Sequence, residues 1–370
     1  MSSEADGIII RRAEPDDAKR VREFLRQVYR PGSAQHDEVR WQWLFGDHDP
    51  PLGRVCDVYL ALTPEQDIMG HVGLLPLQVA VHGEQHSAAW AFNLIVSPAH
   101  RRRGVSSALF RYVASRHERL IGVGPTDRGR AFLTALGWTE MGALVRYSRV
   151  LHWPSYLAWR MRMRLGRWKD APAYARDVPP ATEVHTHQGG VTTLHRFDDS
   201  ADALWERLLP RFGFIAERTA RLLNWRFVDR PGAGYRLLGL LRGGLLEGWC
   251  VCATALWHGF RRGYIVDMLY DPRQGDTGEV LLAAAVAQLR HQQAMTAEMA
   301  TTFAPLQRLL RQVGFRSRGP DKLVHCPAWL RELELSQWLL TRGDAMLDDE
   351  LFYGFRAHDD ADPQSPEGAS

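Results

Sequence analysis

Residues 94–107 read LIVSPAHRRRGVSS and decide the fold. An apolar strand ends at Pro98, the basic loop Arg101–Arg103 follows, and an apolar-periodic helix begins just after Gly104. Free backbone N–H groups at a helix start form a binding site for phosphate, and nearby guanidinium groups strengthen it. A glycine at this position lets the backbone approach a ligand closely. The stretch therefore predicts a pyrophosphate site.

The order of elements around this stretch occurs a second time in the chain. A strand that ends at Pro98, with Gly104 six residues later, corresponds to a strand that ends at Pro272, with Gly278 six residues later. Both halves close on a helix followed by a glycine and an aromatic residue. The shared order predicts two copies of one mixed α/β unit.

The chain divides into five segments on this basis. Residues 7–150 and 192–327 are the predicted copies, and residues 151–191 form a bridge rich in Trp, Met and Arg. Residues 328–355 are predicted to be helical. The polar, acidic residues 356–370 are predicted to be a disordered tail.

The motifs of the first copy resemble those of the GCN5-related N-acetyltransferases (GNAT). Arg101-x-x-Gly104-x-Ser106 is similar to motif A of that family, (Arg/Gln)xxGx(Gly/Ala), with Ser in the last place. Residues 124–138 resemble the motif B helix. The resemblance implies tandem GNAT folds of the α/β class, each a mixed, mostly antiparallel central sheet flanked by helices. The tandem copies and the triple arginine look most similar to the enhanced-intracellular-survival type, with mycothiol synthase as another tandem relative.

The resemblance also implies the cofactor and where it binds. The loop would hold the pyrophosphate of acetyl-CoA, or of another acyl-CoA, and the strand backbone would pair with the pantetheine arm. The cofactor-binding residues expected on this basis are Leu94, Ile95, Val96, Arg101, Arg102, Arg103, Gly104, Val105, Ser106, Ser107, Thr126 and Arg128.

The second copy lacks the arginine loop. Gly275-Asp276-Thr277 stands in its place, and the carboxylate of Asp276 would repel a phosphate. The second copy is therefore predicted to be a structural partner or a subunit contact rather than a second active site.

The catalytic residues are less well marked. Asn93 is predicted to position substrate or a water, with a strand-capping role as the alternative. His71 titrates in the useful range, with a core histidine as the alternative. Many relatives protonate the leaving thiolate with a tyrosine four residues before the motif B glycine, but here that residue is Leu133. The leaving thiolate would then be protonated through water or by another residue.

Composition and charge restrict the other partners. A net charge of +3 over 370 residues gives no reason to expect a nucleic-acid partner. No Cys/His pair stands near Cys250 and Cys252 to complete a zinc site, so no metal is expected. The start, MSSEADGIII, lacks the pattern of a signal peptide, and a cytoplasmic location is expected.

Residues 153–168 mix aromatic residues with arginines. At helical spacing, Leu157, Met161, Leu165 and Trp168 form one stripe, and Arg160, Arg164 and Arg167 form another. The interpretation favoured is an inter-domain helix packed across both copies. A peripheral membrane contact is the alternative, and a homodimer is left open.

The functional prediction is an N-acetyltransferase, or more broadly an acyl-CoA-dependent N-acyltransferase. It would act by direct transfer on a primary amine of a small molecule, an amino sugar or a peptide. Two rivals are kept: a non-catalytic acyl-CoA sensor or scaffold, and an aminoacyl-tRNA-dependent transferase of the tandem type.

Overall fold

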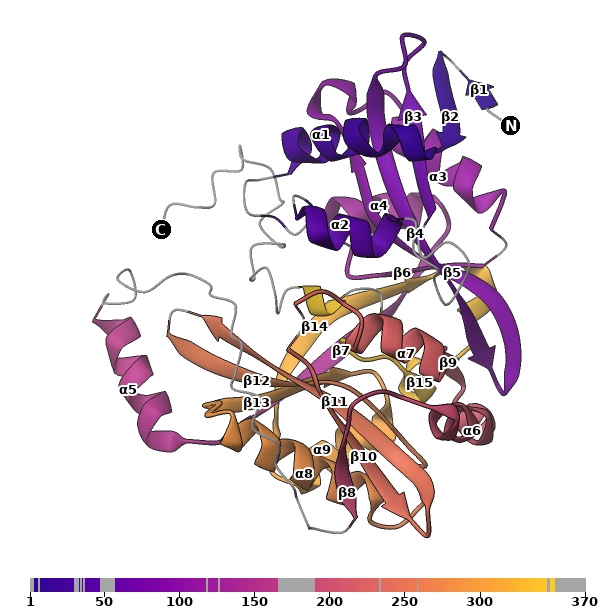
Figure 1. The fold of residues 1–370 in the computed structure, drawn as a ribbon. Coiled ribbons are helices and arrows are strands. Elements are labelled where there is room, and N and C mark those ends of the chain that lie inside the picture. The colour runs from indigo at the N-terminus through magenta and orange to yellow at the C-terminus, as the bar shows by residue number, and fades with distance from the viewer. Residues whose placement is uncertain are drawn as a thin grey trace.

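The computed structural model describes the whole chain except residues 1–2, 6, 30–32, 34, 36, 47–56, 118, 126, 166–189, 233, 258, 345–346 and 350–370. The fold is mixed α/β, with one large, mostly antiparallel sheet flanked by helices (Figure 1). This confirms the fold class predicted from the sequence. The predicted tail, residues 356–370, lies outside the described residues.

The strands are β1 Ser3–Ala5, β2 Ile8–Arg12, β3 Asp57–Leu62, β4 Ile68–Val81, β5 Glu84–Val96, β6 Leu120–Val123, β7 Thr139–Val150, β8 Val191–Leu194, β9 Phe214–Ala216, β10 Arg236–Arg242, β11 Leu245–Trp257, β12 Phe260–Tyr270, β13 Thr296–Thr301, β14 Arg316–Cys326 and β15 Trp338–Leu339. The helices are α1 Ala18–Val28, α2 Glu38–Phe45, α3 Val105–Ala114, α4 Asp127–Ala135, α5 Trp153–Arg164, α6 Asp199–Leu208, α7 Ala220–Phe227, α8 Thr277–His291 and α9 Ala304–Gln312.

The main path of the sheet runs β1-β2-β3-β4-β5-β6-β14-β7-β13-β12-β11-β10-β8. β14 lies between β6 and β7, and β7 in turn pairs with β13. The last strand of each predicted copy is therefore inserted beside the strands of the other. The two predicted units share one continuous sheet, which the sequence analysis did not anticipate.

Both halves contain the same arrangement of three strands. β4 and β5 form a long antiparallel pair, and β6 then pairs parallel to β5. β11 and β12 form the corresponding antiparallel pair, and β13 pairs parallel to β12. This agreement is what the predicted repeat requires, although the division into two units stays a prediction.

One segment differs from the sequence expectations. Residues 328–349 contain the short 3-10 helices Ala328–Leu330, Leu335–Gln337 and Leu347–Asp349 together with β15, instead of a continuous helix. β15 pairs with β9, and this pairing fixes an extended backbone. The bridge forms α5, which has no fully buried residue. Tyr156 and Trp159 on this helix contact Phe260 of the second copy, and packing across both copies stays a prediction. In the described part of the chain, no helix is long and apolar enough to cross a membrane.

Candidate active site

The candidate site lies where β5 and β6 diverge. The two strands pair only at Ala89 with Leu120 and at Trp90 with Ile121. β5 then continues beside β4, while its other edge leaves β6. A cavity of about 430 Å³ occupies this opening, lined by residues 91–96 of β5 and by residues 122–125 at the end of β6 and just after it. Because backbone groups of a sheet edge need partners, this edge can bind an extended ligand.

A bulge in β5 shapes the centre of the opening. The pairing of β4 with β5 shifts between His71 and Gly73, because β5 contains one extra residue there. Asn93 lies in the bulge with a left-handed φ of 54°. A non-glycine residue in this conformation is uncommon and is found at sites where the surrounding structure imposes it.

The side chain of Asn93 is held by a reciprocal pair of amide hydrogen bonds. Its Nδ2 donates to Gln35 Oε1 at 2.9 Å, and its Oδ1 accepts from Gln35 Nε2 at 3.1 Å. The buried Arg40 donates to the same Gln35 oxygen at 3.0 Å. Asn93 therefore lines the cavity, as the sequence predicts, and connects β5 to the segment that precedes α2.

His71 lies behind this bulge and does not line the cavity. It is fully buried, and its Nδ1 is 3.1 Å from the backbone oxygen of Asn93. Burial lowers its pKa to about 4, so the imidazole is neutral at physiological pH. In this state Nδ1–H donates to the Asn93 carbonyl and supports the bulge from the sheet side.

The loop that the sequence predicts to bind pyrophosphate lies directly before α3. Helix α3 begins after Gly104, and no side chain caps its first N–H groups. Arg102 and Gly104 have φ values of 65° and 75°, and the loop is exposed. A Cβ at Gly104 would meet no protein atom within 4 Å. The glycine thus suits the left-handed backbone, and no packing within the described protein requires it.

Arg101 connects this loop to the cavity. Its Nε donates to the backbone oxygen of Val96 at 3.4 Å, and Arg101 and Ser106 both line the cavity. Leu94, Ile95 and Val96 line it too. Of the other residues expected at the cofactor site, Arg102, Arg103 and Ser107 lie on the loop or the helix start but do not line the cavity. Val105 does not line it either, because its side chain is buried in the core under α3. Thr126 lies outside the described residues, and Arg128 lies on α4 with a side chain that is not described.

The remaining wall is apolar and includes residues that the sequence analysis missed. Phe110, Phe132 and Trp138 line it. Leu133 lines it too, at the position where many relatives are expected to carry a tyrosine. Tyr29, directly after α1, also lines the cavity. Nothing in its local sequence marks it, because it reaches the cavity only when α1 packs on the sheet.

The comparisons with known proteins agree with this geometry. Residues 9–119 match the family described as "Acetyltransferase (GNAT) domain". The chain has a GNAT fold. No curated protein matches the chain.

The similar solved structures extend over most of the chain. The N-myristoyltransferase of Saccharomyces cerevisiae with bound myristoyl-CoA has a TM-score of 0.53 at 11% identity, over 88% of this chain and 83% of that chain. A probable N-acyltransferase from Enterococcus faecalis has a TM-score of 0.56 at 15% identity, over 89% and 73%. A GCN5-related N-acetyltransferase from Anabaena variabilis has a TM-score of 0.56 at 12% identity, over 86% and 72%. At these identities the likeness concerns the fold.

The corresponding opening in the second half of this GNAT fold is filled by the chain itself. β12 and β13 pair over Arg262–Tyr264 and Thr296–Glu298, and then diverge. Thr341 forms a bridge to Thr301 on one side, and the Gly343 N–H donates to the Val266 oxygen at 3.0 Å on the other. Residues 338–344 thus occupy the position that stays open between β5 and β6.

The start of α8 is packed rather than open. A Cβ at Gly278 would lie 2.7 Å from the Tyr270 ring and 2.6 Å from Leu309. Asp276 pairs with Arg242 at 2.7 Å. The exposed loop and open helix start of the first half therefore correspond here to residues that contact other parts of the protein.

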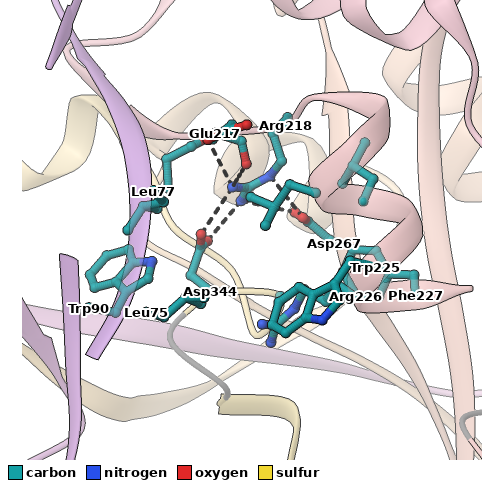
Figure 2. A pocket seen from close by; sticks show the side chains of 14 residues that line it. Leu75, Leu77, Trp90, Glu217, Arg218, Trp225, Arg226, Phe227, Asp267 and Asp344 are labelled. Carbon is teal, nitrogen blue, oxygen red and sulfur yellow. Dashed lines mark hydrogen bonds and ion pairs between the residues drawn. The ribbon is translucent and has the colours of Figure 1, made fainter. Parts of the chain in front are cut away.

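A buried ion cluster fixes residues 338–344 in place. Figure 2 shows Arg218 between Asp267 and Asp344, which it contacts at 2.9 and 2.8 Å. The adjacent cavity has only about 20 Å³, the size of one water, and Leu75 and Leu77 of β4 help to line it. This cluster lies beside β4 of the first half, and the small cavity leaves no room for a substrate.

Proposed function

We propose that the chain is an acyl-CoA-dependent N-acyltransferase. It transfers an acetyl or longer acyl group directly from the thioester to a primary amine of a small molecule, an amino sugar or a peptide. The observation that carries the proposal is the unpaired edge of β5 beside an open cavity, which leads to the uncapped, arginine-flanked start of α3.

The residues of the site fit the parts of an acyl-CoA. The amides of a pantetheine arm are extended and would pair with the backbone of residues 91–96 as a strand does. A pyrophosphate would accept from the N–H groups of α3 and from Arg102 and Arg103. Phe132 and Trp138 offer an apolar wall to the thioester end. The cavity volume lies within the range of small-molecule sites.

The reaction needs a nucleophile, support for the carbonyl and a proton for the leaving group. The neutral amine attacks the thioester carbon, the C–N bond forms, and the C–S bond breaks. One proton leaves the amine, and one arrives on the thiolate. We assign the second proton to Tyr29, because a phenol can donate to a thiolate and Leu133 cannot.

Asn93 is proposed as a positioning residue. Its amide is bound to Gln35, so the pair holds the segment before α2 against the donor strand. We propose that the acceptor amine binds beside this amide pair. His71 is assigned a supporting role through the Asn93 carbonyl.

The second unit, residues 192–327, is proposed to be structural. The segment 338–344 fills its opening, and its helix start is packed. A second candidate function, an acyl-CoA sensor without turnover, is favoured by one observation, the presence of Leu133 at the expected acid position. Binding of acyl-CoA without transfer to any amine would select it.

Calorimetric titration with acetyl-CoA and with longer acyl-CoAs tests the proposal. We expect one site per chain, with affinity lost in Arg102→Ala/Arg103→Ala. Each charge-assisted hydrogen bond to phosphate contributes about 1.5–3 kcal/mol. Arg273→Ala/Arg290→Ala removes the same charge from exposed positions elsewhere and should bind as the wild type does. Equal affinity in both double variants would refute the site.

A further inference from the structure

Helix α5, Trp153–Arg164, lies at the edge of the molecule (Figure 1). Pro154 is in its first turn, and the His152 ring accepts from the Ser155 N–H at 3.3 Å. These features define a firm helix start. No residue of the helix is buried, so most of its surface faces outward.

One face of α5 attaches it to the protein. Tyr156, Trp159 and Met163 are half-buried. The rings of Trp159 and Phe260 have centroids 4.4 Å apart, and those of Tyr156 and Phe260 are 6.0 Å apart. Since residues advance by about 100° along a helix, these three side chains share one narrow face, and Phe260 at the start of β12 holds it.

A second apolar stripe points away from the protein. Trp153, Leu157, Met161 and Leu165 follow one another at intervals of four residues, and their exposed fractions are 59%, 50%, 65% and 69%. This stripe is distinct from the face on Phe260. The apolar stripe predicted from the sequence included Trp168 rather than Trp153, and Trp168 lies outside the described part of the chain.

Arginines flank the exposed stripe on both sides. At helical spacing, Arg160 and Arg164 lie along one border and Arg162 along the other. All three are exposed. The sequence of α5 contains no Asp or Glu, so the outward surface is apolar at its centre and cationic at its borders.

We propose that the outward face of α5 binds the surface of an anionic phospholipid bilayer. The stripe of Trp153, Leu157, Met161 and Leu165 would enter the boundary between headgroups and acyl chains, as apolar faces of interfacial helices do. The flanking arginines extend along an apolar surface and reach phosphate groups with their guanidinium ends. A tryptophan at the end of the stripe suits the headgroup level.

The charge pattern selects this occupant over others. A second copy of α5 would bring three more arginines against these three, and like charges repel. A bilayer with acidic headgroups accepts cationic borders on both sides of a narrow apolar stripe. The proposal is independent of the acyl-CoA site, because none of its residues lines that cavity.

Vesicle sedimentation tests the proposal with the full chain. The probes are phosphatidylcholine vesicles with and without about 30% phosphatidylglycerol, whose anionic headgroups attract cationic side chains. We expect binding to the anionic vesicles only. Arg160→Gln/Arg162→Gln/Arg164→Gln should weaken it about 100-fold, and Leu157→Ser/Met161→Ser/Leu165→Ser should abolish it.

Matched controls remove equivalent groups elsewhere. Arg273→Gln/Arg290→Gln/Arg311→Gln takes away three exposed arginines, and Leu241→Ser/Leu245→Ser takes away exposed leucines. Both controls should sediment like the wild type, and acyl-CoA affinity should be unchanged in every variant. Absent binding, equal binding to neutral vesicles, or equal losses in the controls would overturn the proposal. A dimer in light scattering that the triple serine variant dissociates, without vesicle binding, would also overturn it and assign the face to a second copy.

Discussion

The indole of Trp43 stacks on the indole of Trp225, with ring centroids 4.5 Å apart and planes inclined by 14°. The Nε1–H of Trp43 donates to the backbone oxygen of Trp225 at 3.1 Å. The two tryptophans begin matching stretches of the sequence, Trp43-Leu-Phe45 on α2 and Trp225-Arg-Phe227 on α7. The halves of the fold therefore meet through equivalent side chains as well as through the exchanged strands β7 and β14.

Removal of this contact should destabilise the whole chain. Trp225→Ala leaves a cavity beside Trp43 in a buried cluster, and we expect the free energy of unfolding to fall by about 3–5 kcal/mol. Denaturant unfolding measures the loss. Trp153→Ala, which removes an exposed indole from α5, should change the midpoint very little. Equal losses would mean that the stack does not stabilise the junction.

The parts of this molecule that sequence could predict are those with local signals. Pro98, the arginine loop and Gly104 lie within seven residues of one another, and each constrains its own backbone. The position of β14 between β6 and β7 has no such signal, because strand partners are chosen by packing across the chain. Gln35 and Tyr29 could not be predicted for the same reason, because they reach the site only when α1 and α2 pack on the sheet.

Gly104→Ala should weaken acyl-CoA binding more than it affects the fold. The added methyl group meets no protein atom within 4 Å, so the space it takes is the space proposed for the ligand. The left-handed φ adds strain of about 1 kcal/mol. Gly7→Ala is a close control, with a φ of 73° and equally empty surroundings. We expect similar unfolding free energies for the two variants and a lower acyl-CoA affinity only for Gly104→Ala. Equal acyl-CoA affinities in Gly104→Ala and Gly7→Ala would show that Gly104 is not part of the site.

Tyr29→Phe should lower turnover without changing the affinity for acyl-CoA. A positioned acid contributes about 10²- to 10⁴-fold to the rate, and the variant keeps the ring that lines the cavity. The limb of the pH–rate profile that reports the acid should disappear as well. Tyr156→Phe on α5 is the control and should retain full activity. An unchanged rate in Tyr29→Phe would leave protonation to solvent.

The pair of Asn93 and Gln35 should act on the acceptor rather than on the donor. Asn93→Gly keeps the left-handed backbone without the amide, and Gln35→Ala removes the partner amide. We expect each to raise KM for the amine, with acyl-CoA affinity retained. The double variant should show a coupling of about 0.5–3 kcal/mol, as groups in contact do. If the two single-variant effects on KM simply added in the double variant, Asn93 and Gln35 would act independently.

The pH dependence of stability should report His71. Burial lowers its pKa from 6.5 to about 4 in the folded chain, whereas the unfolded chain binds a proton near pH 6.5. Below that pH the unfolded state takes up more protons, so the free energy of unfolding falls as pH drops from about 6.5 to 4, by about 1.4 kcal/mol per unit. Above pH 7 the contribution is constant. His117 and His325 also have lowered pKa values through burial, so the comparison is between the wild type and His71→Gln. The variant should lose part of this slope while it keeps the slope from the other two histidines, and parallel curves would show that His71 is not buried in the neutral form.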